Sequence, residues 1–214
     1  MFKLIHKVWD VFTASLFPRA CFGCFKKGRY LCQDCLQEIR DPDISYLQRA
    51  DLALTSFSYR TPAIKKVLRK LKYASASHVA EELAEIMASD LTPYIKYGSR
   101  PVICEIPMTG IRKRRRGFNQ AEVLTKHLAR LLNLEHRALL IKIRETKPQA
   151  EIENRQERFK NIGGAFGIKK DVGVPQFVIM VDDIITTGAT INEAARVLKK
   201  SGAKKVIGVA VARG

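Results

Sequence analysis

The residues with the clearest chemistry lie near the C-terminal end of the sequence, in VIMVDDIITTGATI (residues 178–191). Four apolar residues, which are typical of a buried strand, run into the adjacent aspartates Asp182 and Asp183. Two like charges at the end of such a strand need a partner, unless they belong to a solvated turn, which is the alternative interpretation. The tract that follows them is small and polar. It consists of Thr186, Thr187, Gly188, Ala189 and Thr190.

The residues after this tract predict that it precedes a helix. Thr190 and Glu193 have the spacing of a capping box, which places the helix start at about Ile191, and Gly202 ends the helix. The tract then lies between the carboxyl end of a strand and a helix N-terminus, where α/β sheets bind ligands. Backbone N–H groups and the helix dipole form an anion site there, and Gly188 allows close approach. This arrangement predicts a bound monophosphate.

The two aspartates suit a sugar better than a phosphate, because carboxylates repel phosphate. Asp182 and Asp183 can accept hydrogen bonds from the 2′ and 3′ hydroxyls of a ribose whose 5′-phosphate occupies the anion site. Mg²⁺ can bridge the sugar hydroxyls and a pyrophosphate. The sequence lacks the G-x-x-x-x-G-K-[ST] pattern of a Walker A loop. We therefore take Asp182 and Asp183 as the catalytic candidates of a ribose phosphate site.

Cysteines form the second group of chemical interest, since four of the five fall within 15 residues as CFGC and CQDC. Two C-x-x-C pairs at this spacing are typical of a tetrahedral metal site with four thiolate ligands. The ligands would be Cys21, Cys24, Cys32 and Cys35. Such a closed site indicates a structural Zn²⁺. The alternative is two disulfides in a secreted protein, but no secretory signal is evident. Cys104, in PVICEIP, is expected to be a core residue.

Apolar runs and helical spacing divide the rest of the chain into strands and helices. We predict strands at 52–59, 101–107, 139–143, 165–170, 176–181 and 203–212, and helices at 61–73, 77–96, 119–132 and 190–201. The last strand, helix and strand form a βαβ unit, whose continuous apolar strands favour a parallel sheet covered on both faces. Residues 144–161 have almost no apolar face, so we expect a mobile loop or an exposed helix that serves as a lid. The fold class is therefore α/β.

Positive charge dominates the composition, with 38 Lys and Arg against 21 Asp and Glu and a net charge of +17. This balance favours phosphate-rich partners, including nucleic acid. Two segments concentrate it: the helix 61–73, which is predicted to begin at Thr61 and Pro62, and the run 112–116. The alternative for both is a solvated face. In the run, the candidates for contact with pyrophosphate or DNA are Arg112, Arg114, Arg115 and Arg116.

The N-terminal part is predicted to be a separate module. Residues 1–45 contain an amphipathic helix, within 1–17, and the four-cysteine site; 41–44 is read as a connection, and residues 46–214 form the main domain. The helix is expected to pack on its own domain, with a membrane anchor as the alternative. No run of about 18 apolar residues occurs, so we expect no membrane span. Without a secretory signal, we expect a cytoplasmic protein.

The whole of VIMVDDIITTGAT resembles the phosphoribosyl pyrophosphate (PRPP) binding motif of type I phosphoribosyltransferases. CFGC and CQDC, RKRRRGFNQ, KPQAEIENRQERFKNIGGAF and the terminal VAVARG are similar to the ComF (competence protein F-like) family, in the order that the family has them. This resemblance covers nearly the whole chain. It implies a type I phosphoribosyltransferase-like parallel sheet flanked by helices, with a small N-terminal four-cysteine zinc module.

The resemblance also implies roles for these residues. Asp182 and Asp183 would hold the ribose hydroxyls of PRPP, and residues 186–190 its 5′-phosphate, together with Mg²⁺. The turn near 108–112 would be the pyrophosphate loop, and 144–161 the flexible lid. The implied process is uptake of single-stranded DNA by naturally competent bacteria. Single-stranded DNA, and other competence proteins such as a DNA-uptake helicase, would then be partners.

Three functions stay open at this point. The first is a PRPP-dependent transferase, in which C1′ loses pyrophosphate with oxocarbenium character and Arg144, Lys147 or Arg155 reaches the pyrophosphate. The second is a DNA-binding competence factor with PRPP as ligand or regulator, and the third is a PRPP sensor without catalysis. No segment resembles a nucleobase pocket, so the acceptor is not identified. Gln120 and Gln149 are either structural or contact the acceptor.

Overall fold

A six-stranded sheet forms the centre of the computed structural model, which describes residues 19–73, 76–95, 99–148 and 151–214. The strands are β1 (Arg40–Ser45), β2 (Leu52–Ser58), β3 (Val102–Glu105), β4 (Glu135–His136), β7 (Phe177–Ile185) and β8 (Lys205–Arg213). Their spatial order is β1-β2-β8-β7-β3-β4, and all neighbours run parallel except β1, which is antiparallel to β2. The helix expected within residues 1–17 lies outside the described residues.

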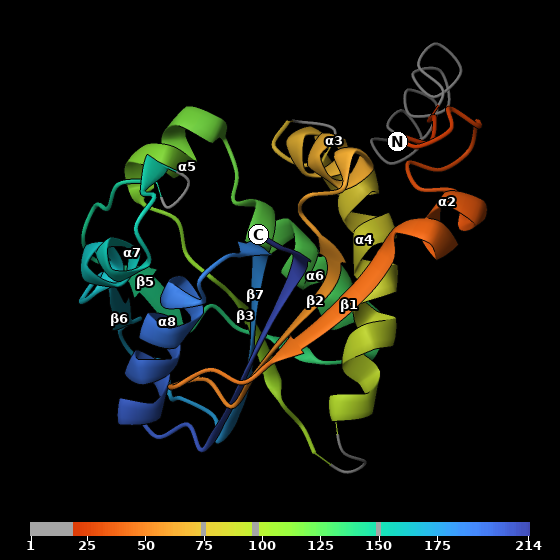
Figure 1. Cartoon of the computed structure of the whole chain (residues 1–214). Coiled ribbons are helices and arrows are strands. Elements are labelled where there is room, and N and C mark those ends of the chain that lie inside the picture. Colours follow the sequence, from red (N-terminus) through yellow and green to blue (C-terminus); the bar gives the residue numbers. More distant parts are fainter. Residues whose placement is uncertain (1–18, 74–75, 96–98, 149–150) are drawn as a thin grey trace, which may run out of the picture.

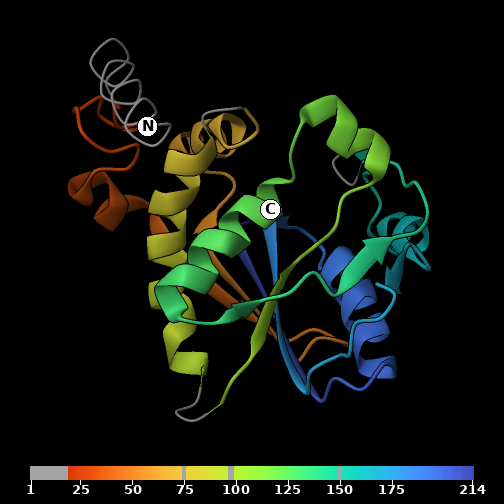
Figure 2. The ribbon, with the colours of Figure 1, turned by 180° about the vertical axis from the view of Figure 1, so that it is seen from behind.

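Helices cover both faces of the sheet, as Figure 1 shows. On one face lie α3 (Pro62–Lys70), α4 (Ala76–Leu91) and α6 (Gln120–Leu132), with α4 and α6 side by side (Figure 2). On the other face lie α8 (Ala189–Lys200) and α7 (Arg155–Ile162), with a separate antiparallel pair, β5 (Leu140–Lys142) and β6 (Phe166–Ile168). The expected α/β architecture is confirmed.

The alternation of side chains along β7 separates the two cores. Ile179 and Val181 point into the core under α3, α4 and α6, whereas Val178 and Met180 point into the core under α8. All four are fully buried, because a parallel central strand has no solvent face. This burial fixes the register of β7 and therefore the position of the residues at its carboxyl end.

Asparagine and proline residues mark the ends of two of these helices. Asn119 is the N-cap of α6, with its side-chain oxygen accepting the N–H of Ala121, and Asn133 ends this helix in the left-handed conformation. Pro62 opens α3 after Thr61, although the Thr61 side chain makes no capping hydrogen bond. No described helix is long and apolar enough to cross a membrane.

Five elements differ from the sequence predictions. Residues 41–44, read as a connection, belong to the edge strand β1, which pairs with β2 through an irregular register between Arg40 and Asp43. β7 does not end before the aspartates but continues to Ile185, because β8 pairs with it as far as Arg213. The other three were not predicted. They are the short strand β4 and the helices α2 (Gln33–Ile39) and α5 (Gly110–Arg116).

Candidate functional site

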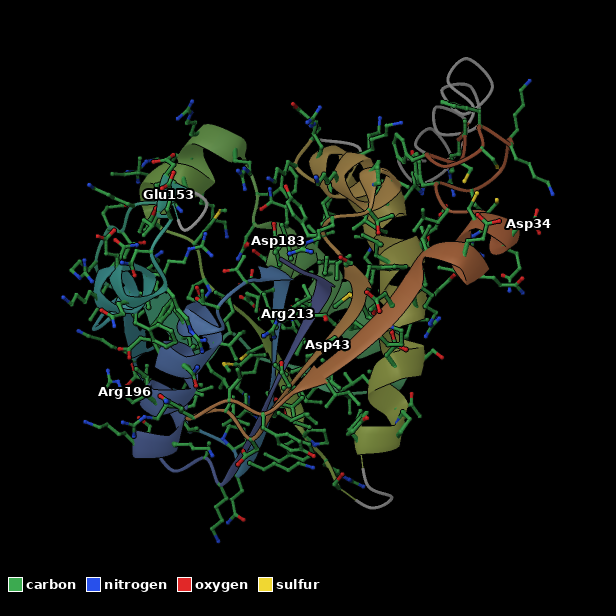
Figure 3. All side chains as sticks on the ribbon, in the orientation of Figure 1. Asp34, Asp43, Glu153, Asp183, Arg196 and Arg213 are labelled. Carbon is green, nitrogen blue, oxygen red and sulfur yellow. The ribbon has the colours of Figure 1, made fainter. Side chains whose placement is uncertain are left out.

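The two aspartates lie in the last part of β7, at the carboxyl end of the parallel sheet, and both are half-buried. Figure 3 shows Asp183 at this end, between α5 and α3. Asp182 Oδ1 accepts the backbone N–H of Asp183 at 2.8 Å. Burial, and then the neighbouring charge of Asp183, raise the pKa of the Asp182 carboxyl above its ordinary value. A ligand that donates hydrogen bonds to both carboxylates would relieve this repulsion.

A glycine gives the turn between β7 and α8 its conformation. Gly188 is the N-cap of α8 with φ +75°, and its carbonyl accepts the N–H of Asn192 at 2.8 Å. Thr187 Oγ1 accepts the N–H of Ala189 at 3.4 Å. The N-terminus of α8 therefore lies at this turn, where the helix dipole favours an anion.

The predicted capping box of α8 is wrong. The helix begins at Ala189 rather than near Ile191, and Thr190 is inside it. Glu193, the other member of that pattern, accepts the N–H of Gly164 at 2.8 Å and binds Arg196. The carboxylate of Glu193 therefore holds the segment that follows α7 instead of capping α8. Thr190 lines the cleft described below.

Cations face the aspartates from the other side. Arg112, in α5, donates to the Thr146 carbonyl at 2.9 Å, and Lys142, in β5, donates to Thr146 Oγ1 at 2.8 Å. Burial, and then the positive charge of Arg112, lower the pKa of Lys142 to about 8. Thr146 thus holds two cationic side chains together, at a place where an anionic ligand would stabilise both.

Gln120 adds an unpaired donor to this group. It is 3% exposed, and its Oε1 accepts from Arg116 at 2.9 Å. Its Nε2 has no hydrogen-bond partner among the described residues. A buried amide N–H₂ without a partner costs free energy unless a ligand oxygen or a water accepts from it.

These groups line one cleft of about 330 Å³, a size that suits a small-molecule ligand. All the residues proposed for PRPP line it, together with Arg112 and Arg116. They are Asp182, Asp183, Thr186, Thr187, Gly188, Ala189 and Thr190. Arg114 and Arg115 are exposed and are not among the lining residues.

The lid segment contributes to this cleft unevenly. Lys147 lines it, but Arg144 donates instead to the carbonyls of Asn161 and Gly163 at 2.8 and 2.7 Å, and Arg155 is not a lining residue. Gln149 lies outside the described residues. Part of the segment forms the helix α7, which agrees with the second of the two expectations for it, an exposed helix.

The structure adds residues that the sequence did not single out as a site. Lys142 and Tyr59 both line the cleft, and Lys72, which the sequence assigned to a basic helix face, lines it too. Lys142 is the charged residue of the otherwise apolar run LLIKI, which was the available signal for it. Tyr59 and Lys72 gave no such signal, because only the fold brings β2 and α3 to the carboxyl end of β7.

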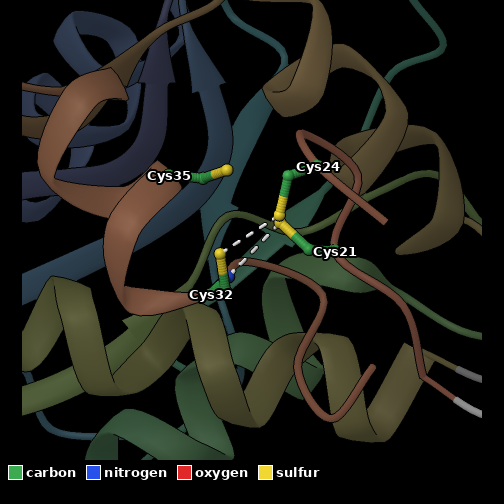
Figure 4. A group of neighbouring side chains, drawn as sticks. All are labelled: Cys21, Cys24, Cys32 and Cys35. Atoms are coloured by element: carbon green, nitrogen blue, oxygen red, sulfur yellow. Dashed lines mark hydrogen bonds between the residues drawn. The ribbon is translucent and has the colours of Figure 1, made fainter. Parts of the chain in front are cut away.

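The four cysteines form a second, separate group (Figure 4). Their sulfur atoms all lie within 4.8 Å of one another, and Cys24 Sγ and Cys32 Sγ are 3.5 Å apart. A tetrahedral zinc site has sulfur atoms roughly 3.8 Å apart, because the Zn–S bond is about 2.3 Å. A Cβ at Gly23 would stand 2.8 Å from Cys35 Sγ, so a larger residue in this turn would displace that sulfur atom. The group could therefore hold a metal ion.

The backbone around the cysteines also suits a thiolate. The N–H groups of Gly23 and Cys32 donate to Cys21 Sγ, each at 3.4 Å. Burial acts to raise the pKa of Cys21, but hydrogen bonds from the backbone of Cys32, Cys24 and Gly23 outweigh it and lower the pKa to about 6.

The four-cysteine segment is fixed to the rest of the protein by α4. The buried carboxylate of Glu82 accepts the N–H groups of Tyr30 at 2.9 Å and Leu31 at 3.4 Å. Leu31 itself is 3% exposed and belongs to the core under α3, α4 and α6. The chain between the two cysteine pairs therefore shares its core with the sheet.

Comparison with known proteins agrees with this architecture. A family model described as "Phosphoribosyl transferase domain" matches residues 76–214. The "DNA utilization protein YhgH" of Salmonella typhi is 31% identical over 157 residues, which cover 72% of this chain and 68% of that protein. The "Competence protein ComFC" of Streptococcus pneumoniae is 30% identical over 187 residues, which cover 87% of this chain and 77% of that protein. A solved adenine phosphoribosyltransferase from Thermoanaerobacter pseudethanolicus is 16% identical, with a TM-score of 0.40 over 82% of this chain and 85% of that one.

Proposed function

Since the chain belongs to the phosphoribosyltransferase domain family and, within it, to the ComF-like proteins, we propose that it binds PRPP with Mg²⁺ in the cleft and supports natural competence. The proposed reaction is transfer of the phosphoribosyl group to an acceptor that stays unidentified. The proposed place of action is the cytoplasm. Single-stranded DNA is the proposed macromolecular partner, and a further competence protein, such as a DNA-uptake helicase, is proposed beside it.

One observation carries the PRPP proposal, namely the order of charges along the cleft. An anion site at the turn 186–190 comes first, the carboxylates of Asp182 and Asp183 come next, and the cations Arg112 and Lys142 follow. PRPP has the complementary order of a 5′-phosphate, two ribose hydroxyls and a pyrophosphate. A simple anion would not need the carboxylates, and a neutral sugar would not need the cations.

In the proposed transfer, the bond between C1′ and the pyrophosphate oxygen breaks and its electron pair leaves with the pyrophosphate. A new bond then forms between C1′ and the acceptor, which loses a proton. Arg112 and Lys142 would stabilise the charge that develops on the leaving group, while Asp182 and Asp183 hold the ribose in place. Mg²⁺, when bound with PRPP, supplies further positive charge to the pyrophosphate.

We propose that the four-cysteine group holds a structural Zn²⁺, since all four ligand positions are thiolates and no open position is left. Its role would be to fix the turn at Gly23 and the chain between the cysteine pairs. The division into a separate N-terminal module at 1–45 and a main domain at 46–214 stays a prediction, and β1 at 40–45 already pairs with the main sheet.

Binding of PRPP can be tested for each subsite by ³¹P NMR, because the 5′-phosphate and the pyrophosphate give separate resonances. We expect both to shift and broaden with the wild type and Mg²⁺. Thr187→Val, which removes one hydroxyl at constant size, should reduce the change at the 5′-phosphate more than at the pyrophosphate. The control Thr92→Val changes a threonine outside the cleft and should match the wild type. Equal changes at both resonances in Thr187→Val would contradict the assignment of the subsites.

Catalysis separates the transferase from a PRPP sensor. Pyrophosphate release from PRPP, followed with a coupled pyrophosphatase assay while nucleosides, bases and oligonucleotides are offered as acceptors, is expected for the transferase. Binding without release under all these conditions would favour the sensor. The competence role requires that the host lose transformation when the gene is deleted and that Asp182→Asn/Asp183→Asn fail to restore it.

A further inference from the structure

One exposed face beside the cleft has unpaired positive charge. α3 contains no acidic residue, and its apolar side chains Ala63, Ile64, Val67 and Leu68 are buried. The other side of α3 and the turn after it present cations. They are Lys65, Lys66, Arg69, Lys70 and Lys72. None of these five makes an ion pair within the described parts of the chain, so their charge is available to an external anion.

Aromatic rings lie at both ends of this face. Phe25 follows Cys24 in the four-cysteine turn, is 71% exposed, and has Lys66 Nζ at 5.7 Å from its ring centre. Tyr73, after the end of α3, is 62% exposed. Phe25 also has φ +64°, a conformation that costs free energy in a residue other than glycine. Exposed rings that alternate with cations are typical of sites for unpaired bases and their phosphates.

This face continues into the cleft. Lys72 and Tyr59 line the cleft, and Lys65 Nζ lies 5.7 Å from the ring centre of Tyr59. Arg112 and Arg116 of α5 line the opposite side. In Figure 1, α3 and α5 stand on either side of the carboxyl end of β7, and the four-cysteine segment lies beyond α3. A strand that follows α3 away from Phe25 therefore arrives at the mouth of the cleft.

We propose that a single-stranded nucleic acid binds along a track formed by Phe25, Lys66, Tyr73 and Lys72, and that it antagonises PRPP at the mouth of the cleft. Both parts rest on the proposed function, the first on its single-stranded DNA partner and the second on its binding of PRPP. Lys72 belongs to both the track and the cleft, and two polyanions brought this close repel each other. Because coupling between two ligands is reciprocal, PRPP must weaken binding of the strand by the same factor.

The track is tested by fluorescence anisotropy with a labelled oligothymidylate. Lys65→Glu/Lys66→Glu is compared with Lys169→Glu/Lys170→Glu, which makes the same charge change at two exposed lysines outside the track. We expect the first pair to weaken binding about tenfold or more, and the second to weaken it much less, since local phosphate contacts dominate over net charge. Equal losses would mean that only the overall positive charge binds the strand and would overturn the track.

The rings are tested separately. Phe25→Ala and Tyr73→Ala should each weaken binding roughly fivefold or more, whereas Tyr46→Ala, which removes a ring that is 85% exposed elsewhere, should leave it unchanged. Melting temperatures of all variants identify any that fail to fold. A duplex or an anionic vesicle that displaces the labelled strand as well as unlabelled oligothymidylate does would contradict a site for unpaired bases.

The antagonism is tested by adding PRPP and Mg²⁺ to the complex with the oligothymidylate, with sodium sulfate at equal ionic strength as the control. We expect PRPP to displace the strand from the wild type but not from Asp182→Asn/Asp183→Asn. PRPP that binds in calorimetry yet leaves the anisotropy unchanged overturns the antagonism and leaves the proposed function intact. PRPP that does not bind at all overturns both, while the lysine and ring variants still decide the track.

Discussion

A Cβ atom at position 188 would stand 2.9 Å from Leu47 Cδ2, so the segment after β1 closes the back of the proposed phosphate turn. Gly188 also has φ +75°. We expect Gly188→Ala to lower the free energy of unfolding by about 1–3 kcal/mol, because the new side chain is strained in this conformation and crowds Leu47. Urea denaturation measures this loss.

Gly173→Ala is the matched control. Gly173 has an exposed position, and a Cβ there would have no atom within 4 Å. Its stability should be unchanged or slightly increased, since alanine restricts the unfolded chain. If both variants lose the same free energy of unfolding, neither the closeness of Leu47 nor the positive φ explains why position 188 needs a glycine.

Lys142 should make PRPP binding depend on pH. Its pKa of about 8 means that the amine loses its charge as the pH rises through this value, and the bound pyrophosphate favours the charged form. Affinity for PRPP is expected to fall between about pH 7 and 9, with proton uptake on binding in that window. Lys142→Arg keeps its charge and should bind with constant affinity over this range. Calorimetry in two buffers of different ionisation enthalpy counts the protons, and zero uptake by the wild type would exclude this role.

The sequence predicted the strand, turn and helix at the centre of the candidate site because the signals for them are local. Four apolar residues before Asp182 and a small polar tract after it specify a strand, a turn and a helix, and the structure has them in that order. Two boundaries failed for lack of local information. β7 extends past the aspartates because β8 pairs with it, and α8 begins at Ala189 because Gly188, rather than Thr190, adopts the capping conformation.

The cationic side of the cleft could not be predicted in the same way. Lys142, Tyr59 and Lys72 come from three elements far apart in the sequence, and only the sheet order brings them to one place. The run 112–116 was identified as a candidate, but its helical form decides which members face the cleft. Arg112 and Arg116 are four residues apart on one helix face and line the cleft, whereas Arg114 and Arg115 are not among its lining residues.

The four-cysteine group is expected to bind about one Zn²⁺ per chain, measured by mass spectrometry of the metal content. Cys35→Ser should lose the metal, since a hydroxyl is a poor replacement for a thiolate. Cys104→Ala, which changes a buried cysteine outside the group, should retain it. Titration of the thiols with a mercurial reagent should release zinc in proportion to the cysteines modified. Metal-free protein with four reactive thiols and unchanged stability would contradict a structural site.

Glu82 should hold the four-cysteine segment against α4. In Glu82→Ala, the buried N–H groups of Tyr30 and Leu31 lose their acceptor. We therefore expect the free energy of unfolding to fall by about 1–3 kcal/mol. Glu85→Ala removes only an exposed ion pair with Arg29 and should cost about 1 kcal/mol or less. Hydrogen exchange at Tyr30 and Leu31 should accelerate in the first variant alone; equal exchange in both would show that Glu82 does not hold this segment.

The most direct test of the central claim is a calorimetric titration of PRPP with Mg²⁺ into the wild type and into Asp182→Asn/Asp183→Asn. The exposed pair Asp41→Asn/Asp171→Asn is the control, because it removes the same charge elsewhere. Loss of two negative charges should by itself strengthen binding of an anion, so weaker binding identifies the lost hydrogen bonds to the ribose. The account predicts a Kd on the order of micromolar for the wild type and control, and no measurable binding for Asp182→Asn/Asp183→Asn. Equal binding by all three proteins, or none by the wild type, would contradict it.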